Sequence, residues 1–113
     1  MTFPFPTFAP IDLSRLDMLS VVNALGLGTN LKLCLDAGDI NSYDGSSQVW
    51  NDASGGGYNF NLGVTSSVEG SDPTFHGTAG AQTVSEYFSV DGADAFTLGQ
   101  SNPTWMQNLH KAG

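Results

Sequence analysis

The sequence predicts a mainly β protein, in which short strands follow an extended N-terminal arm and one α-helix and precede a short C-terminal helix. Two observations lead to this prediction. Short segments with alternating apolar residues are separated by turns rich in glycine, asparagine and aspartate, as is typical of strands and tight loops. In contrast, the spacing of apolar residues that is typical of an amphipathic helix occurs near the N-terminus, in residues 12–25.

The first predicted β region follows this helix. Residues 31–35 alternate leucine with other residues, which predicts a strand whose leucines face a core. Residues 36–47 contain Asp-Ala-Gly-Asp and Tyr-Asp-Gly, and these combinations favour an ordered loop. Strands are then expected at residues 48–50 and 58–62, separated by a glycine-rich turn. We expect Trp50 to fill the core, because large aromatic residues between strand and turn signals are mostly buried.

A second predicted β region lies in the C-terminal half of the chain. Residues 83–90 are expected to form a strand in which Phe88 and Val90 face the core and Tyr87 lies at the surface. An Asp-Gly pair follows, and then a short apolar segment at residues 96–98. Because Asp-Gly is a common hairpin turn, these two segments are predicted to pair as a hairpin.

The last residues carry the signals of a short helix. Asn102 is the expected N-cap, and a proline suited to the first turn follows it. Trp105, Met106 and Leu109 would form an apolar face. This face is expected to dock the helix on the sheets.

The N-terminal arm, residues 1–10, interleaves three phenylalanines with three prolines. Proline removes backbone donors and fixes φ, so the arm is predicted to be extended rather than helical. Free phenylalanines would promote aggregation. We therefore expect the arm to dock on a neighbouring subunit; the alternative is that it folds back over its own sheet.

The helix predicted over residues 12–25 has Asp12 or Ser14 as its N-cap and ends at Gly26. It carries apolar residues on two faces, and a small domain covers only one of them. The second face is expected to contact another subunit, unless the arm covers it. Partner docking is thus predicted for Phe3, Phe5, Phe8, Leu13, Leu16, Met18, Leu19 and Val22.

Four segments resemble the opening of a concanavalin A-like jelly-roll domain, of the laminin-G-like lectin/glucanase superfamily, in the form common on tailed-phage structural proteins. They are residues 33–38 (LCLDAG), 42–45 (SYDG), 50–59 (WNDASGGGYN) and 87–92 (YFSVDG). No residue before Asn30 takes part in the resemblance.

The resemblance implies a partial jelly-roll β-sandwich. Residues 1–30 would form the anchoring arm and helix, and residues 31–113 the first part of the jelly roll. A complete domain of this superfamily is longer than residues 31–113, so the chain is expected to end part-way through the fold at Gly113. Fold alone does not determine function, because this fold carries many unrelated activities.

Composition excludes several classes of partner. The formal net charge is −8, and the three basic residues, Arg15, Lys32 and Lys111, are too scattered to form a patch. Binding to nucleic acid or to an anionic membrane is therefore not expected. No apolar segment reaches the ~20 residues of a membrane helix, and the N-terminus lacks the pattern of a signal peptide. Cys34 is the single cysteine, so no internal disulfide is expected, and we predict a buried thiol.

The sequence does not predict catalysis. A glucanase of this superfamily would carry acidic residues spaced as Glu-x-Asp-x-x-Glu on one strand, whereas Glu69 lies in a predicted loop and Glu86 stands alone. Asp36, Asp39, Asn41 and Asp44 form the best cluster of oxygen ligands. Its carboxylates are interpreted as caps of loop backbone, with a calcium site as the alternative. We predict no cofactor and no resident metal.

Tyrosines could provide a platform for sugars, because aromatic rings stack on pyranose faces. Tyr43, Tyr58 and Tyr87 are the candidate glycan-binding residues.

The favoured hypothesis for function is a virion protein, assembled in the host cytoplasm. It would be the N-terminal part of a phage-type head spike or tail fibre that anchors to a capsid or tail partner, forms a homo-oligomer and displays a glycan-binding domain to a cell-surface polysaccharide. One alternative is a free-standing carbohydrate-binding or glucanase-like domain. Another is a capsid accessory protein without a ligand.

Overall fold

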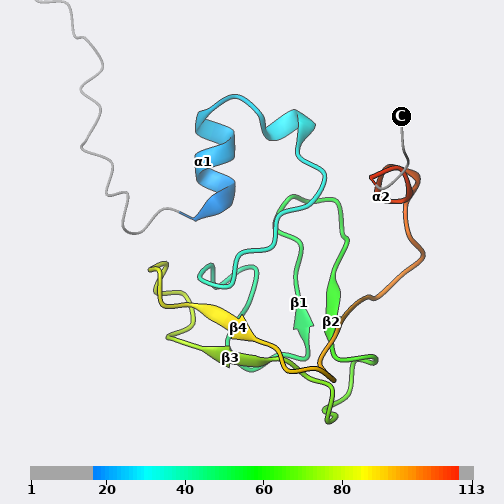
Figure 1. The fold of residues 1–113 in the computed structure, drawn as a ribbon. Helices are drawn as coiled ribbons and strands as arrows, with labels where there is room; N and C mark the ends of the chain where they lie inside the picture. The colour runs from blue at the N-terminus through cyan, green and yellow to red at the C-terminus, as the bar shows by residue number, and fades with distance from the viewer. Residues whose placement is uncertain (1–16, 110–113) are drawn as a thin grey trace, which may run out of the picture.

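The computed structural model describes residues 17–109 (Figure 1), so the predicted docking residues Phe3, Phe5, Phe8, Leu13 and Leu16 lie outside the described part. The described chain is mainly β, with antiparallel sheets and two short α-helices. One sheet has the order β1-β2-β5 and the other pairs β3 with β4. The strands are β1 (Val49–Trp50), β2 (Phe60–Leu62), β3 (Thr74–His76), β4 (Tyr87–Ser89) and β5 (Phe96–Leu98).

The two sheets contact each other through aromatic side chains. Phe88 of β4 is central, with its ring centroid 4.7 Å from that of Trp50 in β1 and 5.3 Å from that of Phe96 in β5. Tyr43, from the loop before β1, lies 4.9 Å from Phe88 on another side and is 3% exposed. Trp50 and Phe88 therefore pack between the two sheets as predicted, although both side chains are half-buried rather than fully buried. Val90 does not, because β4 ends at Ser89 and the side chain of Val90 is exposed.

The predicted hairpin is wrong. The strand β4 pairs with β3, and β5 pairs with β2, so the segment between β4 and β5 connects two different sheets. Carboxylates hold this segment in a polar turn: Asp91 Oδ1 accepts the Ala93 N–H at 2.7 Å, and Asp94 Oδ2 accepts the Asp91 N–H at 2.9 Å. Phe88 and Phe96 thus come from different sheets, and their rings pack on each other.

The predicted strand at residues 31–35 is also wrong, because this segment forms no ladder. Its backbone makes three bonds with the turn after β1. Cys34 N–H donates to Asp52 Oδ1 at 3.0 Å, the Cys34 carbonyl accepts the Ala53 N–H at 2.8 Å, and the Lys32 carbonyl accepts the Ser54 hydroxyl at 3.4 Å. Within residues 31–35, Cys34 is therefore the one buried side chain, as expected of a small residue, while the alternating leucines are half-buried.

The ordered loop predicted over residues 36–47 is confirmed. Its buried Ser42 hydroxyl donates to the Asn51 carbonyl at 2.7 Å and accepts the Asp36 N–H at 3.0 Å. Gly45 adopts φ +87°, a conformation that favours glycine. This loop therefore lies against the end of β1 and places Tyr43 in the core.

The first helix, α1 (Met18–Ala24), is shorter than predicted. Asp17 is its N-cap, because the backbone there is extended and its side chain accepts the Ser20 N–H at 2.7 Å. The predicted N-caps, Asp12 and Ser14, lie outside the described residues. The predicted end is confirmed: Gly26 has φ +73° and donates to the Asn23 carbonyl, in the manner of a Schellman motif. A short 3-10 helix, η1 (Gly28–Asn30), follows.

The C-terminal helix is α2 (Thr104–Gln107). Its N-cap position is Pro103 and not the predicted Asn102, whose carbonyl instead accepts a bond from the side chain of Gln107 at 2.8 Å. Trp105 packs edge-to-face on Tyr58, with 5.3 Å between ring centroids. Leu109 is exposed, so only part of the predicted apolar face is docked.

Candidate functional site

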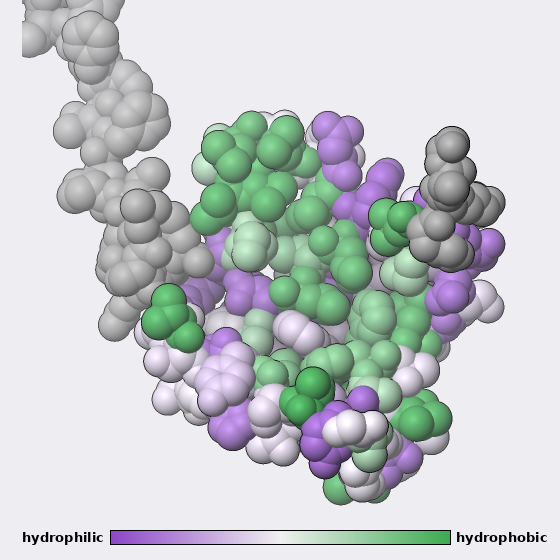
Figure 2. All heavy atoms as spheres, in the orientation of Figure 1, coloured by the Kyte–Doolittle hydropathy of each residue, from purple (hydrophilic) through white to green (hydrophobic). Residues whose placement is uncertain are grey.

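The first candidate surface is α1 with the residues that follow it. No residue of α1 is buried, and among the described helices and strands it contacts only η1. Met18, Leu25 and Leu27 are 54%, 68% and 51% exposed. Figure 2 shows hydrophobic surface gathered over this end of the molecule. We call these three residues the α1 surface; the predicted docking residues Leu19 and Val22 are half-buried beside them.

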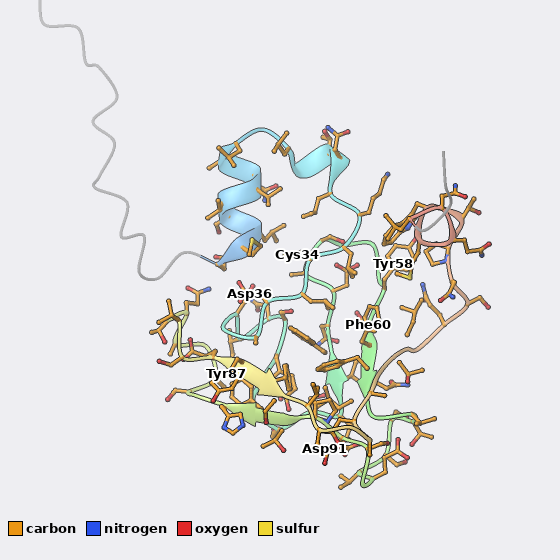
Figure 3. The ribbon with its side chains drawn as sticks, in the orientation of Figure 1. Cys34, Asp36, Tyr58, Phe60, Tyr87 and Asp91 are labelled. Atoms are coloured by element: carbon orange, nitrogen blue, oxygen red, sulfur yellow. The ribbon has the colours of Figure 1, made fainter. Side chains whose placement is uncertain are left out.

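One polar contact ties α1 to the loop region. The Met18 N–H donates to Asp36 Oδ2 at 2.8 Å, while Asp36 Oδ1 accepts the Gly38 N–H at 2.9 Å. Figure 3 shows Asp36 near the start of α1. Two carboxylates, from Asp17 and Asp36, thus satisfy backbone donors in the first turn, where negative charge also interacts favourably with the helix dipole.

The second candidate surface is the outer face of the two-stranded β3–β4 sheet. Its register pairs Thr74 with Ser89 and His76 with Tyr87. Tyr87 is 53% exposed, and its ring lies 4.7 Å from the His76 ring at an angle of only 15°. His76 Nε2 lies 2.8 Å from Ser89 Oγ. These four residues, which we call the ribbon face, place a flat aromatic ring beside hydroxyl and imidazole groups.

The other two tyrosines do not join this surface. Tyr43 is buried between Phe75 and Phe88, so it cannot stack on a sugar and its predicted glycan-binding role is wrong. Burial also raises the pKa of its hydroxyl, with smaller contributions from neighbouring carboxylates. Tyr58 is half-buried against Trp105, and Figure 3 shows it on the part of the fold near α2, away from Tyr87.

Sequence reasoning assigned no role to His76 and Ser89. Their position beside Tyr87 depends on the pairing of β3 with β4, whereas the predicted hairpin paired the β4 segment with residues 96–98. The available signal was the matching alternation in Thr-Phe-His and Tyr-Phe-Ser, each with a central phenylalanine between polar or amphipathic residues. Pairing the two phenylalanines in the core would have put the flanking residues on one outer face.

Acidic side chains have a common structural role. Each aspartate and glutamate in residues 17–109 accepts a hydrogen bond from at least one backbone N–H. Lys32 is the only lysine or arginine in the same range. The negative charge of the described chain is therefore used to satisfy loop donors, and ion pairs with lysine or arginine play little part.

The predicted cap roles of Asp36, Asp39 and Asp44 follow this rule. Asp39 Oδ1 accepts the Asn41 N–H at 2.9 Å, and Asp44 Oδ1 accepts the Ser46 and Ser47 N–H groups at 2.9 and 2.7 Å. The bonds from the two serines lower the pKa of Asp44. Within residues 17–109, no three histidine, cysteine or acidic side chains are grouped as a metal site would require.

Glu69 and Glu86 are also loop caps. Glu69 Oε1 accepts the Val64 and Thr65 N–H groups at 2.6 Å, and Glu86 Oε2 accepts the Thr83 N–H at the same distance. Burial opposes the charge of Glu86, but its hydrogen bonds from Thr83 and Thr78 outweigh this and lower its pKa. Both carboxylates are thus engaged with their own loops.

Asp52 accepts three backbone N–H groups, more than any other carboxylate in residues 17–109. Its Oδ1 accepts the N–H groups of Cys34 and Ser54 at 3.0 and 2.9 Å, and its Oδ2 accepts that of Tyr58 at 3.1 Å. The side chain is buried, and burial alone would raise its pKa. Hydrogen bonds from Ser54, Cys34 and Tyr58 outweigh burial, so the pKa of Asp52 lies below its usual value. Asp52 therefore joins residue 34 to the turn between β1 and β2.

Cys34 is a poor nucleophile in this environment. Its burial raises the pKa of the thiol, and the nearby carboxylates of Asp36 and Asp52 raise it further. The neutral thiol is thus favoured. Cys34 behaves as a small core residue.

No protein-family model, curated protein or solved structure matches this chain. No helix in residues 17–109 is long and apolar enough to cross a membrane.

Proposed function

We propose that this chain is a structural component of a tailed-phage or phage-like virion, the N-terminal part of a head spike or tail fibre whose α1 surface is seated on a neighbouring virion subunit. The observation that carries the proposal is the exposure of Met18 on α1, and of Leu25 and Leu27 just after it, together with the absence of any contact between α1 and a described strand. Fully burying an apolar side chain of this size contributes about 1.5–3 kcal/mol. Seating the α1 surface on a partner would therefore contribute several kcal/mol to docking.

The partial jelly-roll assignment remains part of this proposal. It is supported by two antiparallel sheets that touch through aromatic side chains, and by a chain that changes sheet between β4 and β5. The proposed role is non-enzymatic. Its support is that the carboxylates of Glu69 and Glu86, the candidates for acid and base chemistry, cap their own loops.

Point variants of the α1 surface test the anchoring role in particles assembled with the variant chain in place of the wild type. Replacing Leu25 and Leu27 with serine should reduce incorporation by at least about tenfold, because even half of the expected burial exceeds 1.4 kcal/mol. Replacing the exposed Val68 and Val84 with serine is the matched control and should leave incorporation unchanged. Normal incorporation of the leucine variant would refute the anchoring role.

A second candidate function is a free-standing carbohydrate-binding domain, and the ribbon face is the observation that favours it. The oligomeric state distinguishes the free-standing domain from the virion protein. A spike or fibre protein should sediment as a homo-oligomer or enter particles, whereas a free-standing lectin should sediment as a monomer that binds polysaccharide.

A further inference from the structure

We propose that the ribbon face binds the uncharged pyranose rings of a neutral polysaccharide, with Tyr87 as the stacking ring and His76, Ser89 and Thr74 as hydrogen-bonding groups. This inference rests on the carbohydrate-binding role proposed above as the second candidate function, since it names the ligand class of the ribbon face, and the anchoring role of the α1 surface is compatible with it. The ribbon face lies apart from α1: Figure 3 places Tyr87 on β4, below the helix in this view, and α1 makes no contact with β4. Docking and sugar binding would thus use different parts of the chain.

The core determines which side chains reach the ribbon face. Phe75 and Phe88 are paired in the register of β3 and β4, and their rings lie 5.6 Å apart within the aromatic core. Because side chains alternate across a strand, the residues on either side of these phenylalanines point outward. Packing of the central pair therefore fixes Tyr87 and His76 on the same outer face.

The Tyr87 ring is held in position without a ligand. The His76 ring stacks on it at 15°, and His76 Nε2 is itself within hydrogen-bond distance of Ser89 Oγ. Tyr87 nevertheless remains 53% exposed, so much of the ring is open to solvent. A ring that is already ordered loses little conformational entropy when a ligand stacks on it, which favours binding.

The polar groups around this ring suit a sugar. A pyranose presents C–H groups on one face, which pack on an aromatic ring, and hydroxyl groups at its rim, which need donors and acceptors. Ser89 and Thr74 each offer a hydroxyl that donates and accepts, and His76 offers ring nitrogens. Hydroxyls of an uncharged sugar match these groups without requiring a counter-charge.

Charge selects neutral over acidic sugars. Glu86 directly precedes β4 and Asp91 lies two residues after it, whereas Lys32, the only lysine or arginine in residues 17–109, belongs to the segment before Cys34. The formal net charge of the whole chain is −8. Uronate, sialate, sulfate or phosphate groups would therefore be repelled, with no arginine or lysine on the ribbon face to neutralise them.

A cross-strand Tyr–His pair could instead serve only to stabilise the small sheet, since such pairs contribute to sheet stability. The two explanations differ in what a change of Tyr87 does. Tyr87→Val introduces a β-branched residue that also suits a strand but removes the flat ring, whereas Tyr87→Phe keeps the ring and removes only the hydroxyl. If the pair only stabilises the sheet, both variants should behave alike in sugar binding. If Tyr87 stacks on a sugar, only the variant that lacks the ring should lose binding.

The experiment is a glycan array of neutral and anionic oligosaccharides probed with the full chain, followed by calorimetric titration of the best neutral ligand. Wild type should bind neutral glycans and not their acidic counterparts. Tyr87→Phe should retain affinity within about threefold, and Tyr87→Val should lose at least about tenfold, as expected from loss of an aromatic contact. Val84→Ala, at a fully exposed position outside the strands, is the matched control and should bind as wild type does.

A measurement on the wild type covers the case in which Tyr87→Val fails to fold. During titration with the neutral oligosaccharide, the ring-proton resonances of Tyr87 and His76 should shift, while those of the buried Tyr43 should not. The inference is overturned if wild type binds none of the neutral glycans, if it prefers anionic ones, if folded Tyr87→Val binds like wild type, or if the Tyr87 resonances stay unchanged. Incorporation of the α1 variants is measured separately, so loss of the sugar site and loss of the anchoring role give different results.

Discussion

Asp52→Asn should destabilise the fold although it changes few atoms. Asparagine keeps one acceptor oxygen, which can still bond the N–H groups of Cys34 and Ser54, but its amide nitrogen would face the Tyr58 N–H that Asp52 Oδ2 now accepts. A donor facing a part-buried donor leaves the Tyr58 N–H unsatisfied, at a cost of about 1–3 kcal/mol. For a domain of this size that cost corresponds to a fall in Tm of roughly 5–20 °C.

Urea unfolding at pH 7, followed by tryptophan fluorescence, measures this cost. The midpoint should fall for Asp52→Asn while the m-value stays constant, because the same surface is exposed on unfolding. Asp91→Asn is the control: Asp91 caps an exposed turn through one oxygen, a bond that an asparagine oxygen can also accept. An equal midpoint for Asp52→Asn and wild type would refute the view that this carboxylate fastens residue 34 to the turn after β1.

The pH dependence of the same pair gives a second test. The pKa of Asp52 is lowered in the folded chain, so ionised Asp52 stabilises the fold at pH values above its unfolded pKa, near 3.9. This contribution is lost as pH falls toward and through the folded pKa. The difference in midpoint between wild type and Asp52→Asn should therefore be constant from about pH 5 to 7 and decrease below about pH 4.

Three further predictions concern the core, α1 and the thiol. Phe88→Ala should cost about 3–5 kcal/mol by urea unfolding, because it removes the ring that joins both sheets, whereas Val90→Ala should change stability little. Gly26→Ala should cost about 1 kcal/mol at its left-handed φ, and since α1 packs on no described strand, amide exchange of α1 should accelerate roughly fivefold with little change in Tm. Cys34 should react with a thiol reagent at the rate of global unfolding, and full reaction within seconds in native buffer would contradict its burial.

Local signals in the sequence predicted local features of the fold correctly. The Asp-Ala-Gly-Asp and Tyr-Asp-Gly combinations predicted the loop over residues 36–47, and Gly26 predicted the end of α1, because each depends on backbone conformations that few residues adopt. The surface position of Tyr87 and the core position of Phe88 followed from simple alternation. These features required no knowledge of distant contacts.

Strand pairing could not be read in the same way. Strands of two or three residues carry too little pattern to select a partner, so β4 was assigned to its neighbour in sequence, whereas the aromatic core pairs it with β3. Residues 31–35 showed a strand pattern but bond mainly to a carboxylate and a turn. The ribbon face was only partly predicted for the same reason, since His76 joins Tyr87 through a pairing that tertiary contacts decide.

The way in which the loops are held has a consequence for function. Loops of this chain are held by carboxylates that bond backbone N–H groups, and such bonds fix a loop without consuming aromatic or aliphatic side chains. The residues of the α1 surface and the Tyr87 ring on β4 can then remain exposed while the fold is maintained. If the caps rather than these side chains maintain the loops, replacing Leu25 or Tyr87 should alter binding far more than stability, whereas replacing Asp52 should do the reverse.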